Sequence, residues 1–230
     1  MKILSVETSS PICSVSILDN ENIIYEKEID NALSHSENLM PMIKEAFEYT
    51  NLSLEDIDLF ACSKGPGSFT GIRIGISSIK AFVDVYGKTS IGISSLEGLV
   101  YNENSSEIVC SIINAKNNNA YAGLFKKEKD YYILVNNFLS DSIENIIESL
   151  KEYKQESITF VGDGVEEFEG ILLEDFPNCK FSSNNKCNSV SIGIAAFKHY
   201  NNNLHFDDSL SPLYLKKSQA ERQLEEGKLK

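Results

Sequence analysis

The sequence predicts an α/β fold made of two lobes, each with a mixed β-sheet and flanking helices. Three observations lead to this prediction. Short β-branched runs alternate with longer segments of helical periodicity, the second half repeats the order of the first in shortened form, and residues 102–106 form a polar segment between the halves. We therefore expect one lobe over 1–102, a smaller lobe over 103–188, and a final helix with a charged tail over 189–230.

The first half starts with three strands and continues with two helices separated by a fourth strand. Residues 7–11 have turn composition between two β-rich runs, which predicts an antiparallel hairpin. Ser34 and Glu37 have the spacing of a capping box at the start of a helix. The expected strands are 2–6, 13–18, 23–29 and 58–63, and the expected helices are 34–49 and the segment from Gly67 to about Tyr86.

The second half follows a similar plan. Polar turns join its strands, and an amphipathic segment precedes a strand that ends at Gly162-Asp163-Gly164. Pro212 to Leu215 and a charged tail follow the last helix. The expected strands are 108–114, 120–125, 131–136 and 158–161, and the expected helices are 142–153 and 190–200.

Composition and charge narrow the class of function. The 230 residues are 42% hydrophobic and carry a net charge of −13, so the chain can fold as a globular protein but repels the phosphate backbone of nucleic acids. Its five cysteines are odd in number and form no C-x-x-C pair, and the first residues lack a charged-then-apolar leader, which indicates reduced thiols. No apolar run approaches the ~20 residues of a membrane span. We expect a cytoplasmic protein that contacts RNA only indirectly.

Two helices in the first half are apolar around more of their circumference than packing on one sheet requires. At ~100° per residue, the apolar residues of 34–49 cover an arc of roughly 160°, and those of the second helix form two nearly opposite stripes. Gly71, Gly75 and Ser78 lie between these stripes and would let another backbone come close. Both neighbours could belong to this chain, but we favour the interpretation that one face docks the helices of another protein. The residues expected at this interface are Leu39, Met42, Ile43, Phe47, Gly71, Ile72, Gly75, Ile76, Ser78 and Phe82.

Glycines occur where the strand at 58–63 turns into the next helix. Gly65-Pro66-Gly67 would expose backbone N–H groups at the positive end of that helix, a position suited to a phosphate. Glycine-rich turns are common, so this spacing alone is weak evidence for phosphate binding. The full string from Gly65 to Gly75, GPGSFTGIRIG, is more specific and resembles the signature of the TsaB family, also called YeaZ.

Other segments of the sequence are similar to the same family and occur in its order. They cover nearly the whole chain, and the first hundred residues match best. The matching segments are His35-Ser36-Glu37-x-Leu39-x-Pro41-x-Ile43, Gly92 to Glu97, Asn114 to Lys116 with Tyr121, Gly162 to Gly164, and Pro212 to Leu215.

The resemblance implies an actin-like ATPase fold, the type shared by sugar kinases, Hsp70 and actin, with the final helix returning to the first lobe. It also implies a role as partner and activator of TsaD, the paralogue of TsaB, in tRNA N6-threonylcarbamoyladenosine modification. With the ATPase TsaE, TsaD transfers a threonylcarbamoyl group from its adenylate to N6 of adenosine 37 in tRNAs that read ANN codons. Alone, the chain is expected to form a homodimer through the same helices.

The chain is not expected to be an enzyme. TsaD carries the motif Asn-His-Leu-Glu-x-His, whose two histidines can reach one metal ion, and this sequence has Ser95 and Leu99 in their places. Glu7 replaces the family's usual aspartate before Thr8, and Lys116 replaces its usual arginine, which weakens a nucleotide site. We expect no catalytic residue, no metal and no required cofactor.

Because the resemblance is to a superfamily of ATPases, it also implies weak binding of ATP or ADP at the interface with TsaD. The candidate contacts are Thr8, Ser9, Gly65 and Gly67. The alternative function is a small ATPase or kinase of the same superfamily, for which Glu7 and the glycine turns supply fragments but no base. A peptidase is disfavoured because Ser68 has no identifiable His and Asp partners.

Overall fold

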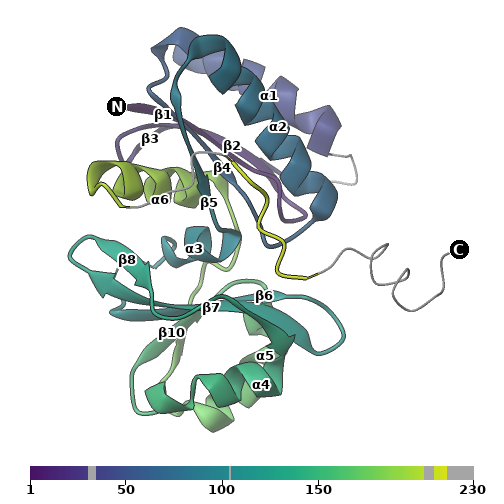
Figure 1. Ribbon diagram of the computed structural model, residues 1–230, viewed down its shortest axis with the longest axis vertical. Helices are drawn as coiled ribbons and strands as arrows, with labels where there is room; N and C mark the ends of the chain where they lie inside the picture. The colour runs from purple at the N-terminus through teal and green to yellow at the C-terminus, as the bar shows by residue number, and fades with distance from the viewer. Residues whose placement is uncertain (31–34, 104, 205–209, 217–230) are drawn as a thin grey trace, which may run out of the picture.

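The computed structural model describes residues 1–30, 35–103, 105–204 and 210–216. Helices and sheets alternate in layers along its long axis, and the two sheets define an upper and a lower lobe in the view of Figure 1. The expected α/β fold of two lobes with mixed sheets is therefore confirmed. Over the described part of the chain, no helix is long and apolar enough to cross a membrane.

The upper lobe contains a five-stranded sheet with two long helices on one face. Its elements are β1 (Lys2–Glu7), β2 (Cys13–Asp19), β3 (Asn22–Ile29), α1 (His35–Thr50), the short 3-10 helix η1 (Leu54–Asp56), β4 (Leu59–Ser63), α2 (Phe69–Tyr86) and β5 (Thr89–Ile93). The strand order is β3-β2-β1-β4-β5; β2 runs antiparallel to β1 and β3, whereas β1, β4 and β5 are parallel. α1 and α2 cover this sheet and bury an apolar core that includes Leu4, Met42 and Phe60.

Local signals set the ends of α2. Ser68 caps its start, because the Ser68 hydroxyl accepts a hydrogen bond from the N–H of Gly71 at 3.2 Å. Gly87 ends it in the left-handed conformation, with φ of 62°, and donates its N–H to the carbonyl oxygen of Val83.

The lower lobe repeats the strand order of the upper lobe. Its elements are β6 (Ile108–Asn114), β7 (Asn119–Glu128), β8 (Tyr131–Leu134), β9 (Leu139–Ser142), α4 (Ile143–Ser149), the 3-10 helix η2 (Lys151–Tyr153), β10 (Ile158–Val161), α5 (Gly164–Asp175) and β11 (Lys180–Phe181). The main path of its six-stranded sheet is β11-β10-β6-β7-β8, and β9 pairs with β7. Without β9, and in the reverse direction, the path is β8-β7-β6-β10-β11. The third, second, first, fourth and fifth strands of the lobe therefore follow one another as they do in the upper sheet. The topology supports duplicated lobes.

Two helices lie between the sheets and join the lobes (Figure 1). They are α3 (Ser95–Val100) and α6 (Ser189–Asn201). α6 packs on β1, β2 and β4, so the final helix returns to the upper lobe. A single apolar cluster includes Ile93 of the upper sheet, Val109 of the lower sheet and Ile192 of α6. The lobes therefore share part of their core.

Most of the predicted elements are confirmed, and the differences have local causes. The elements β5, α3, β9, α5 and β11 are not among those expected from the sequence. The helix α5 does have a signal, because Val165, Phe168 and Leu172 recur at helical spacing and are buried. The expected helix over 142–153 divides near Leu150 into α4 and η2. The N-cap predicted at Ser34 and all of the expected tail after Leu215 except Lys216 lie outside the described residues.

The cysteines are free thiols that serve mainly as core residues. Cys13, Cys62, Cys110 and Cys187 are buried, and Cys179 is half-buried. Burial raises the pKa of the Cys62 thiol to about 12 and that of the Cys110 thiol to about 12. Such thiols carry little thiolate near neutral pH, which makes them poor nucleophiles.

Lys198 on α6 links the two lobes electrostatically. Its Nζ lies 2.6 Å from Oε1 of Glu21 in the β2–β3 turn and 2.9 Å from Oδ2 of Asp130 in the β7–β8 turn. The Lys198 side chain is only 8% exposed, and burial would lower its pKa, but its hydrogen bonds to the two carboxylates raise the pKa instead. The hydrogen bond from Lys198 lowers the pKa of Asp130. The ammonium therefore stays charged and bridges the lobes.

Replacing Lys198 with methionine is expected to loosen this connection. The variant keeps an unbranched side chain but removes a charged donor, and hydrogen bonds to charged groups contribute about 1.5–3 kcal/mol. We expect the midpoint of thermal unfolding, followed by circular dichroism, to fall by about 4–8 °C. As a control, Lys151→Met removes an exposed ion pair with Glu148 and should change the midpoint by no more than about 2 °C.

The effect of Lys198→Met should depend on pH. Because the pKa of Asp130 is lowered from 3.8 in the folded protein, its contribution to stability is present above that ordinary value and is lost as the pH falls through the lower folded-state value. The difference in unfolding midpoint between the wild type and the variant should thus be complete at about pH 7 and should shrink below about pH 4. An equal difference at both ends of this range would contradict the ion-pair explanation.

Candidate functional site

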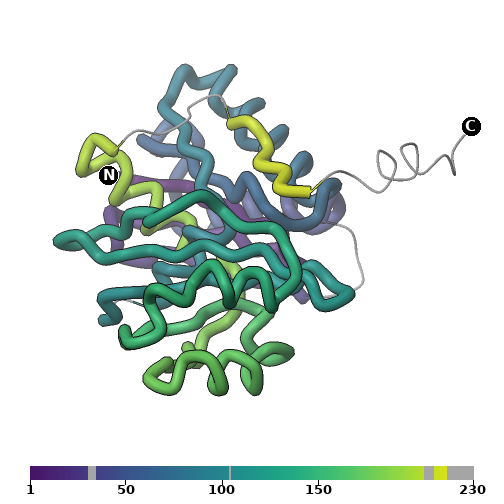
Figure 2. The backbone as a smooth tube through the Cα atoms, turned by 60° about the horizontal axis from the view of Figure 1, so that its bottom comes forward, coloured from purple at the N-terminus to yellow at the C-terminus, as the bar shows by residue number. Residues whose placement is uncertain are grey.

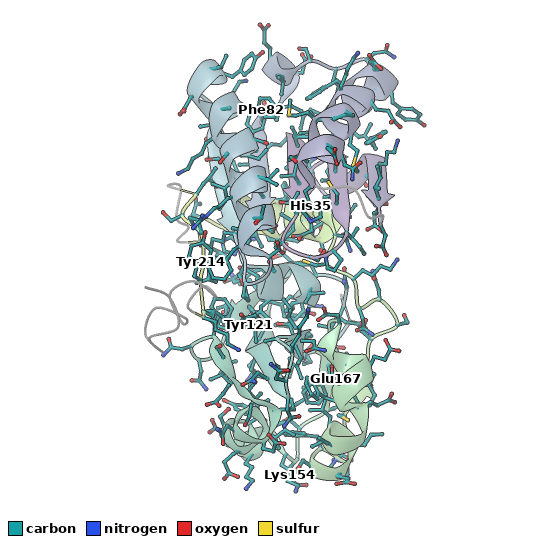
Figure 3. The ribbon with its side chains drawn as sticks, turned by 90° about the vertical axis from the view of Figure 1, so that its right-hand side faces the viewer. His35, Phe82, Tyr121, Lys154, Glu167 and Tyr214 are labelled. Atoms are coloured by element: carbon teal, nitrogen blue, oxygen red, sulfur yellow. The ribbon has the colours of Figure 1, made fainter. Side chains whose placement is uncertain are left out.

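A cleft of about 670 Å³ lies between the two lobes. The β1–β2 turn, the loop before α2 and His35 form its upper wall, and Tyr121, Asp163 and the β6–β7 turn form its lower wall. Figure 3 shows His35 in the upper lobe and Tyr121 in the lower lobe. The volume is in the range of small-ligand sites, so the hydrogen bonds around the cleft decide what it can hold.

A hydrogen-bond network around Glu7 supports the β1–β2 turn from behind. Oε1 of Glu7 accepts hydrogen bonds from the N–H of Ser9 at 2.5 Å, from the hydroxyl of Ser9 at 2.6 Å and from the N–H of Ser10 at 3.0 Å. The Ser9 hydroxyl also lies 2.7 Å from Oγ of Ser95 on α3. Glu7 is fully buried, and its Oε2 has no hydrogen-bond partner within the described ranges. The carboxylate therefore holds its own turn in place.

The glycine-rich loop packs directly against the same turn. A Cβ atom on Gly67 would lie 2.2 Å from the carbonyl oxygen of Ser9, and one on Gly71 would lie 1.9 Å from that of Thr8. The N–H of Ser68 donates to the carbonyl oxygen of Ser9 at 2.7 Å, and the Thr8 hydroxyl donates to that of Gly71 at 2.8 Å. The glycines thus permit close backbone packing, and this packing uses donors that a phosphate would need.

The four candidate cofactor contacts divide between the cleft and the packing behind it. Ser9 and Gly67 line the cleft. Thr8 and Gly65 are buried behind it, with the Thr8 hydroxyl bonded to the start of α2 and Gly65 pressed against the carbonyl oxygen of Leu213. The hydroxyls of Thr8 and Ser9 and the N–H of Ser9 are engaged within the protein, and the buried carboxylate of Glu7 lies behind them, which disfavours an anionic phosphate.

Asp163 shapes the lower wall of the cleft. Its Oδ1 accepts a hydrogen bond from the N–H of Asn114 at 2.9 Å, and the Asn114 side chain donates to Glu167. Desolvation by the surrounding protein raises the pKa of Asp163, although its side chain lines the cleft and is exposed to solvent there. Lys116 brings a positive charge to the same wall. This wall therefore presents both signs of charge.

α3 carries the residues that stand in place of the paired histidines of TsaD. Ser95 is fully buried and is engaged by the Ser9 hydroxyl, whereas Leu99 presents an apolar side chain to the cleft. Glu97 pairs with His199 of α6 and does not line the cleft. Over the described residues, no group of three or more His, Cys, Asp or Glu side chains is suited to hold a metal ion.

The structure places most of the expected docking residues inside the upper lobe. Leu39, Met42, Ile43, Ile72 and Ile76 are at most 5% exposed and pack in the core beneath the helices. The sheet of the same chain covers these five side chains in this conformation, and a contact between them and a partner stays a prediction.

The remaining expected docking residues are distributed between the sheet and the surface. Gly71 and Gly75 face Thr8, and a Cβ atom on Gly75 would lie 2.5 Å from the Thr8 hydroxyl oxygen. Phe47, Ser78 and Phe82 are half-buried, and Figure 3 shows Phe82 near the far end of α2. Only these three retain exposed area that a partner could contact.

The outer faces of α1 and α2 present a different set of apolar residues. Met40 is 48% exposed and Val85 is 74% exposed, while Ala81 is exposed and Ile74 half-buried. A shallow groove of about 430 Å³ runs between the two helices. This α1–α2 groove is lined by Ser36, Leu39, Met40, Thr70, Arg73, Ile74, Ser77 and Ser78. The sequence shows both stripes of α2, but their hydrophobicity alone does not indicate which stripe the sheet covers.

Two lobes with the same strand order around a cleft define a protein of the actin-like, sugar-kinase type of fold. A ROK hexokinase from Thermus thermophilus shares this fold with a TM-score of 0.58 and 8% identity, covering 88% of this chain and 100% of its own. A Pseudomonas aeruginosa protein described as similar to the peptidase YeaZ has a TM-score of 0.77 and 19% identity, covering 94% of this chain and 99% of its own. At these identities the likeness concerns the fold alone.

Sequence comparison gives the family. A family model for TsaD, tRNA N6-adenosine threonylcarbamoyltransferase, matches residues 29–224. The tRNA threonylcarbamoyladenosine biosynthesis protein TsaB of Buchnera aphidicola subsp. Baizongia pistaciae is 32% identical over 78% of this chain and 86% of its own length. The chain belongs to the TsaB family, within the wider group that the TsaD model describes.

The close packing at Gly71 predicts that this position affects the fold rather than a docking contact. Gly71→Ala would press a methyl group against the Thr8 carbonyl, and overpacking of this kind costs about 1–3 kcal/mol. We expect urea unfolding to show this loss for Gly71→Ala and at least as large a loss for Gly75→Leu. Gly170→Ala in α5 is the matched control, because its Cβ would meet nothing within 4 Å and should stabilise the helix by about 0.5–1 kcal/mol. Wild-type stability of Gly71→Ala would refute the packing argument.

Proposed function

We propose that this chain is a non-catalytic partner and activator of a TsaD-type protein in tRNA N6-threonylcarbamoyladenosine modification, and that it docks through the α1–α2 groove. The observation that carries the proposal is the apolar lining of that groove, where Met40 is 48% exposed and Ile74 is half-buried on two helices that pack on the sheet. Apolar and methionine side chains grouped on a surface favour protein–protein contact. Relatives named TsaB are proteins of threonylcarbamoyladenosine biosynthesis, which supports this pathway.

A TsaD-type partner is supported by the likeness between the two families. The family model that matches this chain is the one for TsaD, so a TsaD-type protein is expected to have its own helices in the positions of α1 and α2. Two similar surfaces can meet around a twofold or nearly twofold axis, and a stable contact buries on the order of 1,600 Å². Without that partner, two copies of this chain would pair through the same groove.

The transfer reaction is assigned to the partner because the cleft of this chain has few of the groups that could catalyse it. Leu99 cannot ligate a metal and Ser95 is bonded to Ser9, while the N–H of Ser68 in the glycine loop donates to the carbonyl oxygen of Ser9. We therefore propose that the chain needs no cofactor, and that ATP or ADP binds it weakly at most, beside the interface. With a net charge of −13, it would contact tRNA and TsaE only through the complex, in the cytoplasm.

Charges placed in the groove should prevent complex formation without unfolding the chain. We expect Met40→Glu and Ile74→Glu to weaken binding to a purified TsaD-type protein by at least about 30-fold, because each would bury an unpaired carboxylate in the contact. Isothermal titration calorimetry measures the affinity, and thermal unfolding checks the fold. Leu173→Glu is the matched control, since Leu173 is 47% exposed on α5 of the lower lobe and should tolerate the charge. Wild-type affinity in both groove variants would exclude this surface.

Reconstitution tests the proposed activity. Purified TsaD-type and TsaE-type proteins, threonylcarbamoyl-adenylate and unmodified tRNA should yield N6-threonylcarbamoyladenosine only when this chain is added, as measured by mass spectrometry of the nucleosides. The chain alone should release no phosphate from ATP and Mg²⁺. Modification at the same rate without the chain, or ATP turnover by the pure chain, would count against a non-catalytic partner.

A further inference from the structure

Arg73 lines the α1–α2 groove and belongs to a small aromatic assembly. Its Nε donates a hydrogen bond to the Tyr214 hydroxyl at 2.8 Å, and its guanidinium carbon lies 5.7 Å from the centre of the Tyr214 ring. The Tyr214 ring stacks on Phe69, with ring centres 4.5 Å apart and planes inclined by 15°. These three residues are named the Arg73 platform.

The Arg73 platform is built from two distant parts of the chain. Residues 210–216 lie beside α2, as Figures 2 and 3 show, and bring Tyr214 to its first turns. Leu210 is 1% exposed in the core of the upper lobe, and the N–H of Leu213 donates to the carbonyl oxygen of Lys64 at 2.7 Å. Backbone and side-chain contacts therefore fix the Tyr214 ring before any partner arrives.

Arg73 itself is exposed and lacks a carboxylate partner within the described residues. Its Nε is used by Tyr214, which leaves the terminal guanidinium nitrogens, and they suit a bidentate contact with a carboxylate. Of the 21 basic residues in the sequence, only Arg73 and Arg222 are arginines. A lysine could supply the charge, but it could not both stack on an aromatic ring and present a planar fork. The chemistry at this position is thus specific to a guanidinium.

We infer that the Arg73 platform binds a carboxylate of the TsaD-type partner and that Tyr214 makes the segment 210–216 part of the docking surface. The inference rests on the proposed function and extends it, because Arg73 also lines the α1–α2 groove next to Ile74. Charge complementarity favours the contact: an exposed guanidinium that has no carboxylate partner among the described residues attracts an acidic side chain of a partner. Tyrosine and arginine are enriched among the residues that dominate binding energy, and a group fixed in advance loses less entropy on binding.

Calorimetric titration of the chain with the purified TsaD-type protein tests this inference. Arg73→Ala and Arg73→Lys should each weaken binding by at least about 10-fold, because the lysine keeps the charge but not the fork. Tyr214→Phe keeps the stack on Phe69 and removes the hydroxyl that orients Nε, so it should weaken binding less than Tyr214→Ala does. Lys80→Ala is the control, since Lys80 is exposed two turns further along the same face of α2 and should bind nearly as the wild type does. Thermal unfolding should be unchanged in Arg73→Ala and Tyr214→Phe.

The outcomes separate this inference from the proposed function. If Met40→Glu abolishes binding while Arg73→Ala binds as tightly as the wild type, the inference about Arg73 is wrong, but docking through the α1–α2 groove is still supported. If Arg73→Lys binds like the wild type, or Lys80→Ala weakens binding as much as Arg73→Ala, charge alone acts and the bidentate contact is refuted. If the wild-type chain does not bind the TsaD-type protein, the proposed function itself is refuted.

Discussion

The contact between Thr8 and the first turns of α2 is the constraint on which the rest of the structure depends. The Thr8 hydroxyl donates to the carbonyl oxygen of Gly71, and no Cβ atom fits at Gly71 or Gly75. The backbone of α2 therefore lies directly on the β1–β2 turn, at a fixed distance and a fixed rotation about the helix axis. That rotation sends the stripe containing Ile72 and Ile76 into the core and leaves Ile74 half-buried.

The same constraint changes what the cleft between the lobes can do. When the glycine loop packs on the β1–β2 turn, the N–H of Ser68 is bonded to Ser9 and the Ser9 hydroxyl is bonded to Glu7. The lobes are also joined by a shared apolar cluster and by the ion pairs of Lys198, so a hinge motion that opened the cleft would break these ion pairs and expose core surface. A chain built in this way is better suited to present a rigid face than to close around a nucleotide.

The sequence predicts the architecture well and the exact surface poorly, for one physical reason. Strands and helices are encoded by local periodicity, which is why β1 to β4, α1 and α2 could be located from their own residues. Exposure is decided by which neighbour covers a face, and α2 has two apolar stripes that look alike in the sequence. The glycines at 71 and 75 contain the missing information, because a helix approaches another backbone most closely where it has no side chains. They indicate the buried side of the helix, although the same pattern also suits an interface.

The affinity of the outer surface of α1 and α2 for a partner depends on how firmly the inner faces of these helices are packed. Helices held by Leu39, Met42 and Ile72 on their inner side have little freedom left to lose when a partner covers the outer side, so more of the contact energy appears as affinity. Tyr214 adds a second support, because it orients a side chain that would otherwise sample many rotamers. The apolar groove and the oriented guanidinium then have different roles, since apolar area supplies most of the binding energy and the charged fork favours partners that place a carboxylate beside Arg73. Related chains with the same fold can share the apolar groove and still differ in whether a guanidinium lies beside it, and this difference would distinguish their partners.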